Sequence, residues 1–236
     1  MTLCIVQEFI DGRTLEAEIA AKRPDERAVL LILRDLLKIL SHLGSLRPPV
    51  VHRDLKPQNL MRRRSDESLV LIDFGSVRDV VKDSLAGGST VAGTFGYMYP
   101  EQFAGEATPA TDIYGVGATG LALLAGTGPE RFLGRDGQLG WHGRVVMSDG
   151  LRSLLTGMLE THPNRRPAAA AALALVDELL AGPIKPPNPL PNIAAAKVAM
   201  RIGPFERMIL GFVFFGRYRF HDLLGGSRDP RFFRHI

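Results

Sequence analysis

The stretch His52-Arg53-Asp54-Leu55-Lys56-Pro57-Gln58-Asn59 decides how this sequence is interpreted, together with Ile72-Asp73-Phe74-Gly75 further along the chain. Each motif begins at or near the end of a short apolar run, Val50-Val51 and Leu69 to Ile72, and we predict both runs as strands. Polar side chains that follow two neighbouring strands can converge on one site. The second motif places its aspartate 19 positions after the aspartate of the first.

The polar residues of these two loops are suited to phosphoryl transfer. That reaction needs metal ions on the phosphates, a group that orients the attacking hydroxyl, and neutralisation of the developing charge. Asp54, Asn59 and Asp73 offer three oxygen-bearing side chains, the ligands that Mg²⁺ prefers. An isolated Asp-Phe-Gly would carry little weight, but the two motifs in this order and spacing are a strong signal.

On these motifs the sequence resembles the eukaryotic-like serine/threonine protein kinase family over residues 1–181. The resemblance implies a mainly α fold with short β-hairpins, corresponding to the large C-terminal lobe of a kinase. It implies ATP and Mg²⁺ as cofactors and a protein Ser or Thr hydroxyl as the acceptor. The amino-acid sequence of residues 96–103 and 110–119 is most similar to that of bacterial, particularly cyanobacterial-type, kinases.

The resemblance also implies roles for the residues of the two loops. Asp54 matches the catalytic base and Lys56 the residue that stabilises the transferred phosphate. Asn59 and Asp73 match the metal ligands. Thr94 belongs to the same catalytic set, and with Lys56 it indicates serine/threonine rather than tyrosine specificity.

A nucleotide site is implied near the start of the chain. Gln7-Glu8-Phe9-Ile10 resembles the gatekeeper and hinge of the family, in which Gln7 and the backbone of Glu8 and Ile10 contact adenine. Met61 is expected to form the floor of the same pocket.

Further matches imply structural and regulatory roles. Tyr99-Pro100-Glu101 stands where the family usually has Ala-Pro-Glu. Asp112 matches an aspartate of the central helix that anchors the catalytic loop, the name used below for residues 52–59. His162 to Pro167 resembles the family's Asp-Pro-x-x-Arg-Pro signature, so Arg166 is expected to pair with Glu101. That buried pair would be structural, and breaking it would be costly.

Arg53 beside the base is typical of kinases that are regulated by phosphorylation of the activation loop. A phosphate there would give Arg53 a partner and order the segment. The candidate acceptors are Ser84, Ser89 and Thr90, of which Thr90 is preferred.

The sequence differs from the family pattern in the part that precedes the hinge, Gln7 to Ile10. Only six residues precede Gln7, so the glycine-rich loop, the phosphate-gripping lysine and its glutamate partner have no counterpart in this sequence. We therefore expect the N-terminal lobe to be missing, the chain to have little kinase activity alone, and the face that would pack on that lobe to be exposed.

Three interpretations stay open. In the first, the chain is part of an active kinase. In the second, it is a pseudokinase-like nucleotide-binding or scaffold module. The intact Asp54, Asn59 and Asp73 favour the first, because a module freed from catalysis has no physical need for all three. A small-molecule phosphotransferase of the aminoglycoside or choline type ranks last, since those proteins lack a Tyr-Pro-Glu segment with a paired arginine.

Patterning along the chain predicts the remaining elements. Leu3 to Gln7 is predicted to form a strand, and Trp141 is predicted to be a packing residue. Arg62-Arg63-Arg64 is predicted to lie in a solvated hairpin; the alternative is that it forms a patch for acidic substrates. Helices are predicted at 14–21, 26–44, 111–125, 149–160 and 168–180, with residues 76–109 as loop and 126–147 irregular.

Charge and composition divide the chain into three parts: the kinase-like region 1–181, a Pro-rich linker at 182–200, and a basic apolar tail at 201–236. Residues 1–182 hold 20 Lys+Arg against 22 Asp+Glu, a net charge of −2, and residues 183–236 hold 9 against 3. Nothing in the main body suggests a nucleic-acid surface. The single cysteine, Cys4, excludes an internal disulfide and favours a reducing, cytoplasmic location.

The tail leaves two interpretations open. Its apolar run 208–215 is too short to cross a bilayer. Basic flanks suit peripheral contact with a membrane through residues 207–219, whereas the alternative is a segment packed back on the lobe.

Overall fold

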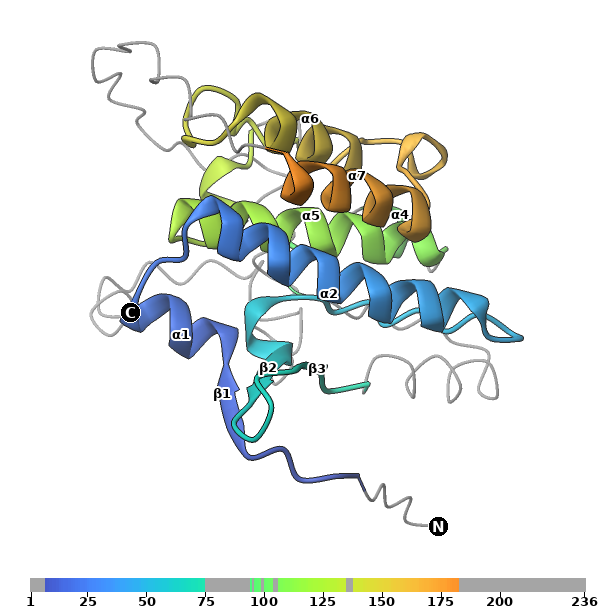
Figure 1. The fold of residues 1–236 in the computed structure, drawn as a ribbon. Coiled ribbons are helices and arrows are strands. Elements are labelled where there is room, and N and C mark those ends of the chain that lie inside the picture. Colours follow the sequence, from blue (N-terminus) through green and yellow to red (C-terminus); the bar gives the residue numbers. More distant parts are fainter. Residues whose placement is uncertain are drawn as a thin grey trace, which may run out of the picture. The chain divides into compact units, whose positions relative to one another are not determined.

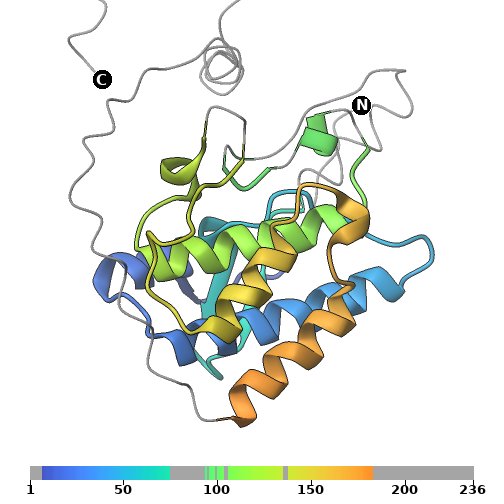
Figure 2. The ribbon, with the colours of Figure 1, turned by 90° about the horizontal axis from the view of Figure 1, so that it is seen from above.

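The computed structural model describes residues 7–74, 94, 96–98, 100–103, 106–134 and 138–182, and the structural statements below concern these residues. The predictions for Leu3 to Val6, Cys4, Ser84, Ser89, Thr90, Tyr99 and the region from 183 onward lie outside them. The described chain is mainly helical with one small sheet (Figure 1). The longer helices are α2 (Glu26–Ser45), α5 (Pro109–Ala125), α6 (Asp149–Met158) and α7 (Ala169–Ala181), and they pack together on one side of the sheet (Figures 1 and 2).

Helix α2 buries the stripe that its sequence predicts. The Asp25 side chain caps it by accepting the Ala28 N–H at 2.8 Å, and the acidic Glu26 lies in the first turn, where the helix dipole favours it. The buried positions recur at helical spacing: Val29, Leu30, Ile32, Leu33, Leu36, Leu37 and Leu40. The helix ends at Ser45, one residue beyond the predicted stop at Gly44. The backbone is already extended at Leu46, two residues before Pro48.

Helix α5 is buried on nearly all sides and forms the centre of the core. It starts at Pro109, two residues earlier than predicted, because Thr108 and Thr111 form a capping box and proline is favoured in the first turn. A Cβ on Gly115 would lie 2.9 Å from the Leu55 side chain, so the missing side chain lets the catalytic loop pack directly on this helix.

The sheet is antiparallel, with strand order β1 (Gly12–Thr14), β2 (Leu60–Arg63) and β3 (Leu69–Leu71). The predicted hairpin of β2 and β3 is confirmed, whereas β1 was not predicted. The predicted strand at Val50-Val51 is wrong. The Val50 N–H instead donates to the Leu43 carbonyl at 3.1 Å, so this segment is tied to the last turns of α2 and needs no strand partner.

The arginines of the hairpin are paired with acids from the N-terminal segment. Arg62 bonds Glu18 at 3.1 Å, Arg63 bonds Glu8 at 2.5 Å and Arg64 bonds Asp11 at 3.2 Å. With their charges compensated in this way, these side chains serve the fold rather than forming a patch for acidic substrates. They attach the hinge segment and the short helix α1 (Leu15–Ala21) to the sheet.

The second half of the lobe follows the prediction with small differences. The described residues of 126–147 are irregular except for the 3-10 turn η2 (Pro129–Phe132) and an isolated bridge between Leu133 and Leu139, and Trp141 is a packing residue, 1% exposed. Helix α6 stops at Met158 rather than residue 160. The predicted loop 76–109 contains a short helix, α4 (Pro100–Phe103). Among the described residues, no helix combines the length and the apolar composition that spanning a membrane requires.

Candidate active site

The catalytic loop brings Asp54, Lys56, Asn59 and Thr94 into one hydrogen-bonded network. Asp54 accepts the Thr94 hydroxyl at 2.8 Å on Oδ1, and the Asn59 amide N–H at 2.9 Å on Oδ2. Lys56 Nζ lies 2.8 Å from Asp54 Oδ2 and donates to Thr94 Oγ1 at 2.6 Å. The carboxylate is therefore held in one orientation beside a cation and a hydroxyl.

The predicted metal ligands lie on adjoining parts of this site. The 3-10 turn η1 (Pro57–Asn59) carries Asn59, whose backbone carbonyl accepts the Ile72 N–H at 2.9 Å, and Asp73 follows directly. Both N–H···O contacts of the Asn59 side chain run from its nitrogen to Asp54, so the amide oxygen is not used by them. A carboxylate and a side-chain amide oxygen form a donor set that fits Mg²⁺.

Arg53 and Asp73 both have backbone angles in the left-handed region, with φ of 72° and 62°. Such angles are strained for residues with a side chain and persist only where the surroundings impose them. Aspartate tolerates this region better than arginine does, so the strain lies mainly at Arg53, whose backbone is held by its contacts with Asp112 and Gln102.

His52 links the two loops, a role that sequence reasoning did not assign although the residue belongs to the quoted motif. The ring is fully buried; Nδ1 accepts the Asp54 N–H at 3.3 Å and Nε2 contacts the Ile72 carbonyl at 3.0 Å. That pattern requires the neutral imidazole. Burial lowers the pKa of His52, which favours this neutral form. The ring also meets Phe74 edge-on, 4.7 Å between centroids.

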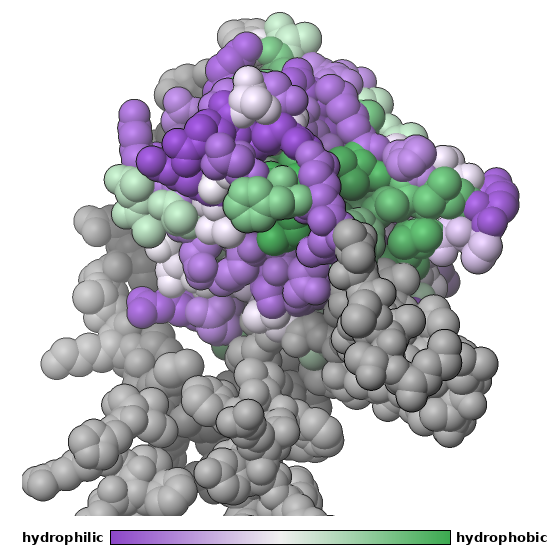
Figure 3. Space-filling model, turned by 90° about the horizontal axis from the view of Figure 1, so that it is seen from below, coloured by the Kyte–Doolittle hydropathy of each residue, from purple (hydrophilic) through white to green (hydrophobic). Residues whose placement is uncertain are grey.

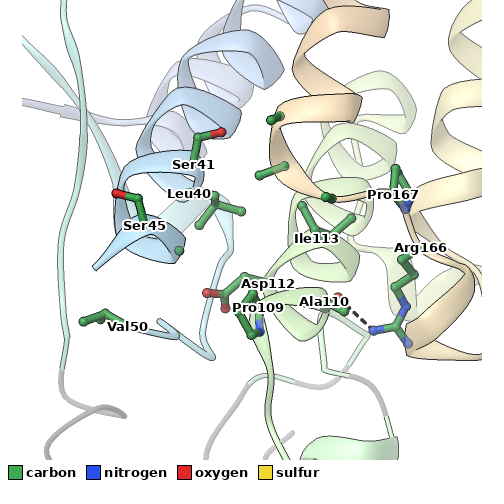
Figure 4. Close-up of a pocket in the computed structure, with 14 residues that line it drawn as sticks. Leu40, Ser41, Ser45, Val50, Pro109, Ala110, Asp112, Ile113, Arg166 and Pro167 are labelled. Carbon is green, nitrogen blue, oxygen red and sulfur yellow. Dashed lines mark hydrogen bonds between the residues drawn. The ribbon is translucent and has the colours of Figure 1, made fainter. Parts of the chain in front are cut away.

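Asp112 anchors the catalytic loop from the first turns of α5. Its carboxylate accepts the backbone N–H groups of His52 and Arg53, each at 2.8 Å. Burial raises the pKa of Asp112 to about 6, against the lowering effect of these two hydrogen bonds. Figure 4 shows Asp112 and Arg166 on the wall of a cavity of about 500 Å³ between α2, α5 and the start of α7.

The expected pair between Glu101 and Arg166 is present. Arg166 Nη1 donates to Glu101 Oε1 at 2.5 Å and to the Ala110 carbonyl at 2.9 Å, the bond drawn in Figure 4. The Arg166 side chain is fully buried and the Glu101 side chain is 10% exposed. Arg166 also lies over the Tyr114 ring at 5.1 Å. The pair thus joins α4, α5 and the loop before α7.

The backbone of Arg53 is held by hydrogen bonds, whereas one nitrogen of its side chain has no hydrogen-bond partner among the described residues. The Gln102 amide donates to the Arg53 carbonyl at 2.5 Å, a contact that no motif in the sequence indicated. Arg53 Nε is buried without a hydrogen-bond partner among the described residues, and burial lowers the pKa of this guanidinium. Its predicted phosphorylated partner, Thr90, lies outside the described residues.

The residues expected to contact adenine lie in the segment before β1 and in β2. Gln7, Glu8 and Ile10 form an extended segment without regular structure, and Met61 lies between Thr14 and Val70 in the sheet register. Apolar groups are exposed here: Phe9 is 88% exposed and Phe74 39%. Figure 3, which views the molecule from below, shows hydrophobic residues exposed among hydrophilic ones.

Comparisons with known proteins point to one family. The family model described as "Protein kinase domain" matches residues 1–176. Serine/threonine-protein kinase B of Synechocystis sp. is 36% identical over 174 residues, which cover 69% of this chain and 30% of that protein. Serine/threonine-protein kinase D of the same organism is 32% identical over 201 residues, 81% of this chain and 39% of that protein.

Serine/threonine-protein kinase PknA of Nostoc sp. is 33% identical over 196 residues, covering 79% of this chain and 34% of that protein. The chain spans between about 30% and 40% of the length of these relatives. The family model and the three relatives, taken with the site geometry, show that the chain belongs to the eukaryotic-like serine/threonine protein kinase family.

Proposed function

We propose that this lobe transfers the γ-phosphoryl group of ATP to a Ser or Thr hydroxyl of a protein substrate. The observation that carries the proposal is the network of Asp54, Lys56, Asn59 and Thr94. It fixes a carboxylate where an attacking hydroxyl could be oriented and places a cation 2.8 Å from it. Positioning and charge neutralisation are what phosphoryl transfer requires of a protein.

The proposed roles follow from these contacts. Asp54 accepts the proton of the substrate hydroxyl, and Asn59 and Thr94 hold its carboxylate in place. Lys56 offsets negative charge beside the transferred group. Mg²⁺, held by Asn59 and Asp73, would neutralise charge on the phosphates of ATP.

The nucleotide base would lie against the exposed hinge face. We assign Gln7 and the backbone groups of Glu8 and Ile10 to adenine contacts, and Met61 to the pocket floor. The Arg63–Glu8 ion pair supports this assignment, since it attaches the hinge segment to the sheet that carries Met61.

We further propose that these 236 residues, purified by themselves, transfer phosphate slowly or not at all. The sequence contains no glycine-rich loop and no strand lysine before Gln7. The 88% exposed Phe9 side chain supports a face made to be covered by further protein. A kinase small lobe covering this face would complete the grip on the phosphates.

The test compares the 236-residue chain with a fusion that joins the small lobe of the Synechocystis kinase B to its hinge. Transfer of labelled phosphate from Mg-ATP to a Ser/Thr-containing protein is measured for both. We expect strong transfer by the fusion and little by the chain alone. A folded fusion that binds Mg-ATP without transferring phosphate would contradict the kinase proposal and support the scaffold module.

Regulation, location and membrane contact stay predictions. Phosphorylation of Thr90 would supply Arg53 with a partner, and the buried, unpartnered Nε of Arg53 supports a missing anion there. A cytoplasmic location and peripheral membrane contact through residues 207–219 rest on composition alone.

A further inference from the structure

A hollow at the C-terminal end of α5 is lined by three arginines and lies apart from the catalytic loop. Its volume is about 420 Å³, and its walls include Arg23, Thr127, Arg131, Phe132, Arg144 and Val146. Figure 1 shows this end of α5 beside the start of α2, at the end of the helix away from α4. Helix α5 has 17 residues, so its two ends are roughly 25 Å apart at 1.5 Å per residue.

The positive charge of this hollow has no carboxylate partner in the part of the chain that the structure describes. Within the described ranges, no carboxylate lies within ion-pair distance of Arg23, Arg131 or Arg144. The nearest acids along the chain have other partners: Glu26 accepts the N–H and the hydroxyl of Ser148, and Asp25 caps α2.

A third acid, Glu130, lies on η2 next to Arg131. Its carboxylate packs against Gly128, and its negative charge contributes to raising the pKa of Tyr97, after the larger effect of burial. Among the described residues, no ion pair joins this carboxylate to Arg23, Arg131 or Arg144.

Neutral groups hold one of these cations in place. The Arg144 guanidinium lies 4.9 Å from the Phe132 ring centroid and donates long bonds of 3.4 Å to the carbonyls of Gly140 and Arg131. Arg23 packs against Gly126, the C-cap of α5, where the helix dipole favours a cation in any case. Arg131 and Arg144 are therefore the stronger indication of an anionic ligand.

We propose that this hollow binds a phosphorylated Ser or Thr side chain of a protein segment. Guanidinium forks match phosphate oxygens in geometry and charge. The Phe132 ring and the 40% exposed Val146 offer apolar contact to the residues that flank the phosphate. The net charge of −2 over residues 1–182 gives the lobe no general attraction to an anionic membrane, which favours recognition of a single phosphate.

The test measures binding of a fluorescent acetyl-Val-phosphothreonine-Val-amide peptide to the 236-residue chain by anisotropy. We expect binding of this peptide and none of its unphosphorylated counterpart. Arg131→Gln and Arg144→Gln should each weaken binding roughly tenfold through loss of charge-assisted hydrogen bonds. Arg144→Lys should lose less, because it keeps the charge, and Arg23→Gln should have the smallest effect.

Two matched variants serve as controls. Arg165→Gln and Arg13→Gln each remove an exposed arginine elsewhere on the lobe, and both should retain binding. Unchanged affinity in the Arg131→Gln, Arg144→Gln double variant, with its unfolding midpoint intact, would overturn the proposal. Binding to phosphatidylserine vesicles without binding to the peptide would also overturn it, in favour of a membrane surface.

Discussion

At its N-terminal end, helix α5 carries the buried Asp112 carboxylate, with both oxygens occupied by backbone N–H groups, beside the paired Arg166 and Glu101. At its C-terminal end, Arg131 and Arg144 line a hollow in which no described carboxylate pairs with them. Charge at the first end is compensated inside the protein, so it should contribute to stability and to the shape of the catalytic loop. Charge at the second end should contribute little to stability and is available to a ligand.

The largest effect should come from Glu101→Ala. This change leaves the fully buried Arg166 guanidinium without its carboxylate, and breaking a buried pair in this way costs about 3–5 kcal/mol. The free energy of unfolding from urea titration measures it. Glu106→Ala, at an exposed acid nearby, is the matched control and should change little. An unchanged midpoint for Glu101→Ala would refute the role of the pair.

Asp112→Ala should follow, with a loss of about 2–4 kcal/mol, because it leaves two buried backbone N–H groups without an acceptor. The gain from removing a costly buried charge offsets part of this loss. The variant should also loosen the catalytic loop, seen as faster hydrogen exchange at the amides of His52 and Arg53. Exchange rates equal to those of the unmodified chain would contradict the anchoring role.

A smaller effect concerns pH. Burial lowers the pKa of His52 below 6.5, so the unfolded chain takes up a proton before the folded one as pH falls. Stability should therefore decline as pH falls from 7.5 to 6. Asp112, whose pKa is raised to about 6 in the folded chain, has the opposite effect on stability. As pH falls from 6 towards the lower pKa of this aspartate in the unfolded chain, the folded chain takes up the proton first, which stabilises it. His52→Gln should flatten the decline, leaving the part due to His142, whose pKa burial also lowers.

His42→Gln, at an exposed histidine, is the matched control for this experiment. A slope that survives unchanged in His52→Gln would show that the buried imidazole is not the group that titrates.

The smallest effect on stability should come from Arg131→Gln. The side chain is exposed and has no ion pair among the described residues, so the free energy of unfolding should change by less than about 0.5 kcal/mol. A loss of 2 kcal/mol or more by urea titration would show that the hollow is a structural element, and would remove the contrast between the two ends of α5.

Which features could be predicted depends on how local their causes are. Apart from the short helix α4, which was missed, the helices follow from apolar spacing and caps such as Asp25, and they were predicted to within two residues at either end. The loop residues Asp54, Asn59 and Asp73 could be singled out because each lies in a short continuous motif, and their catalytic and metal-binding roles stay predictions. Strand β1 was missed because its three residues carry no alternation, and Val50-Val51 was mistaken for a strand because its partner is a helix end.

The contacts that were missed are long-range. Gln102 reaches the Arg53 carbonyl across 49 positions, and the arginines of the hollow come together from residues 23, 131 and 144. No periodicity or motif connects such positions. The role of His52 could have been inferred, because a histidine that follows the apolar Val50-Val51 and precedes Asp54 by two residues is expected to be buried and to need hydrogen-bond partners within the fold.

The most direct test of the account compares Asp54→Asn with Asp35→Asn in the kinase B fusion, both folded. Asp35 is a partly exposed aspartate on α2 that pairs only with Arg34 and Lys38 among the described residues. If the network around Asp54 orients and deprotonates the acceptor hydroxyl, Asp54→Asn should lower the rate of phosphoryl transfer by at least about 100-fold. Asp35→Asn should leave it unchanged. Equal rates for the two variants would contradict the assignment of Asp54 as the catalytic base.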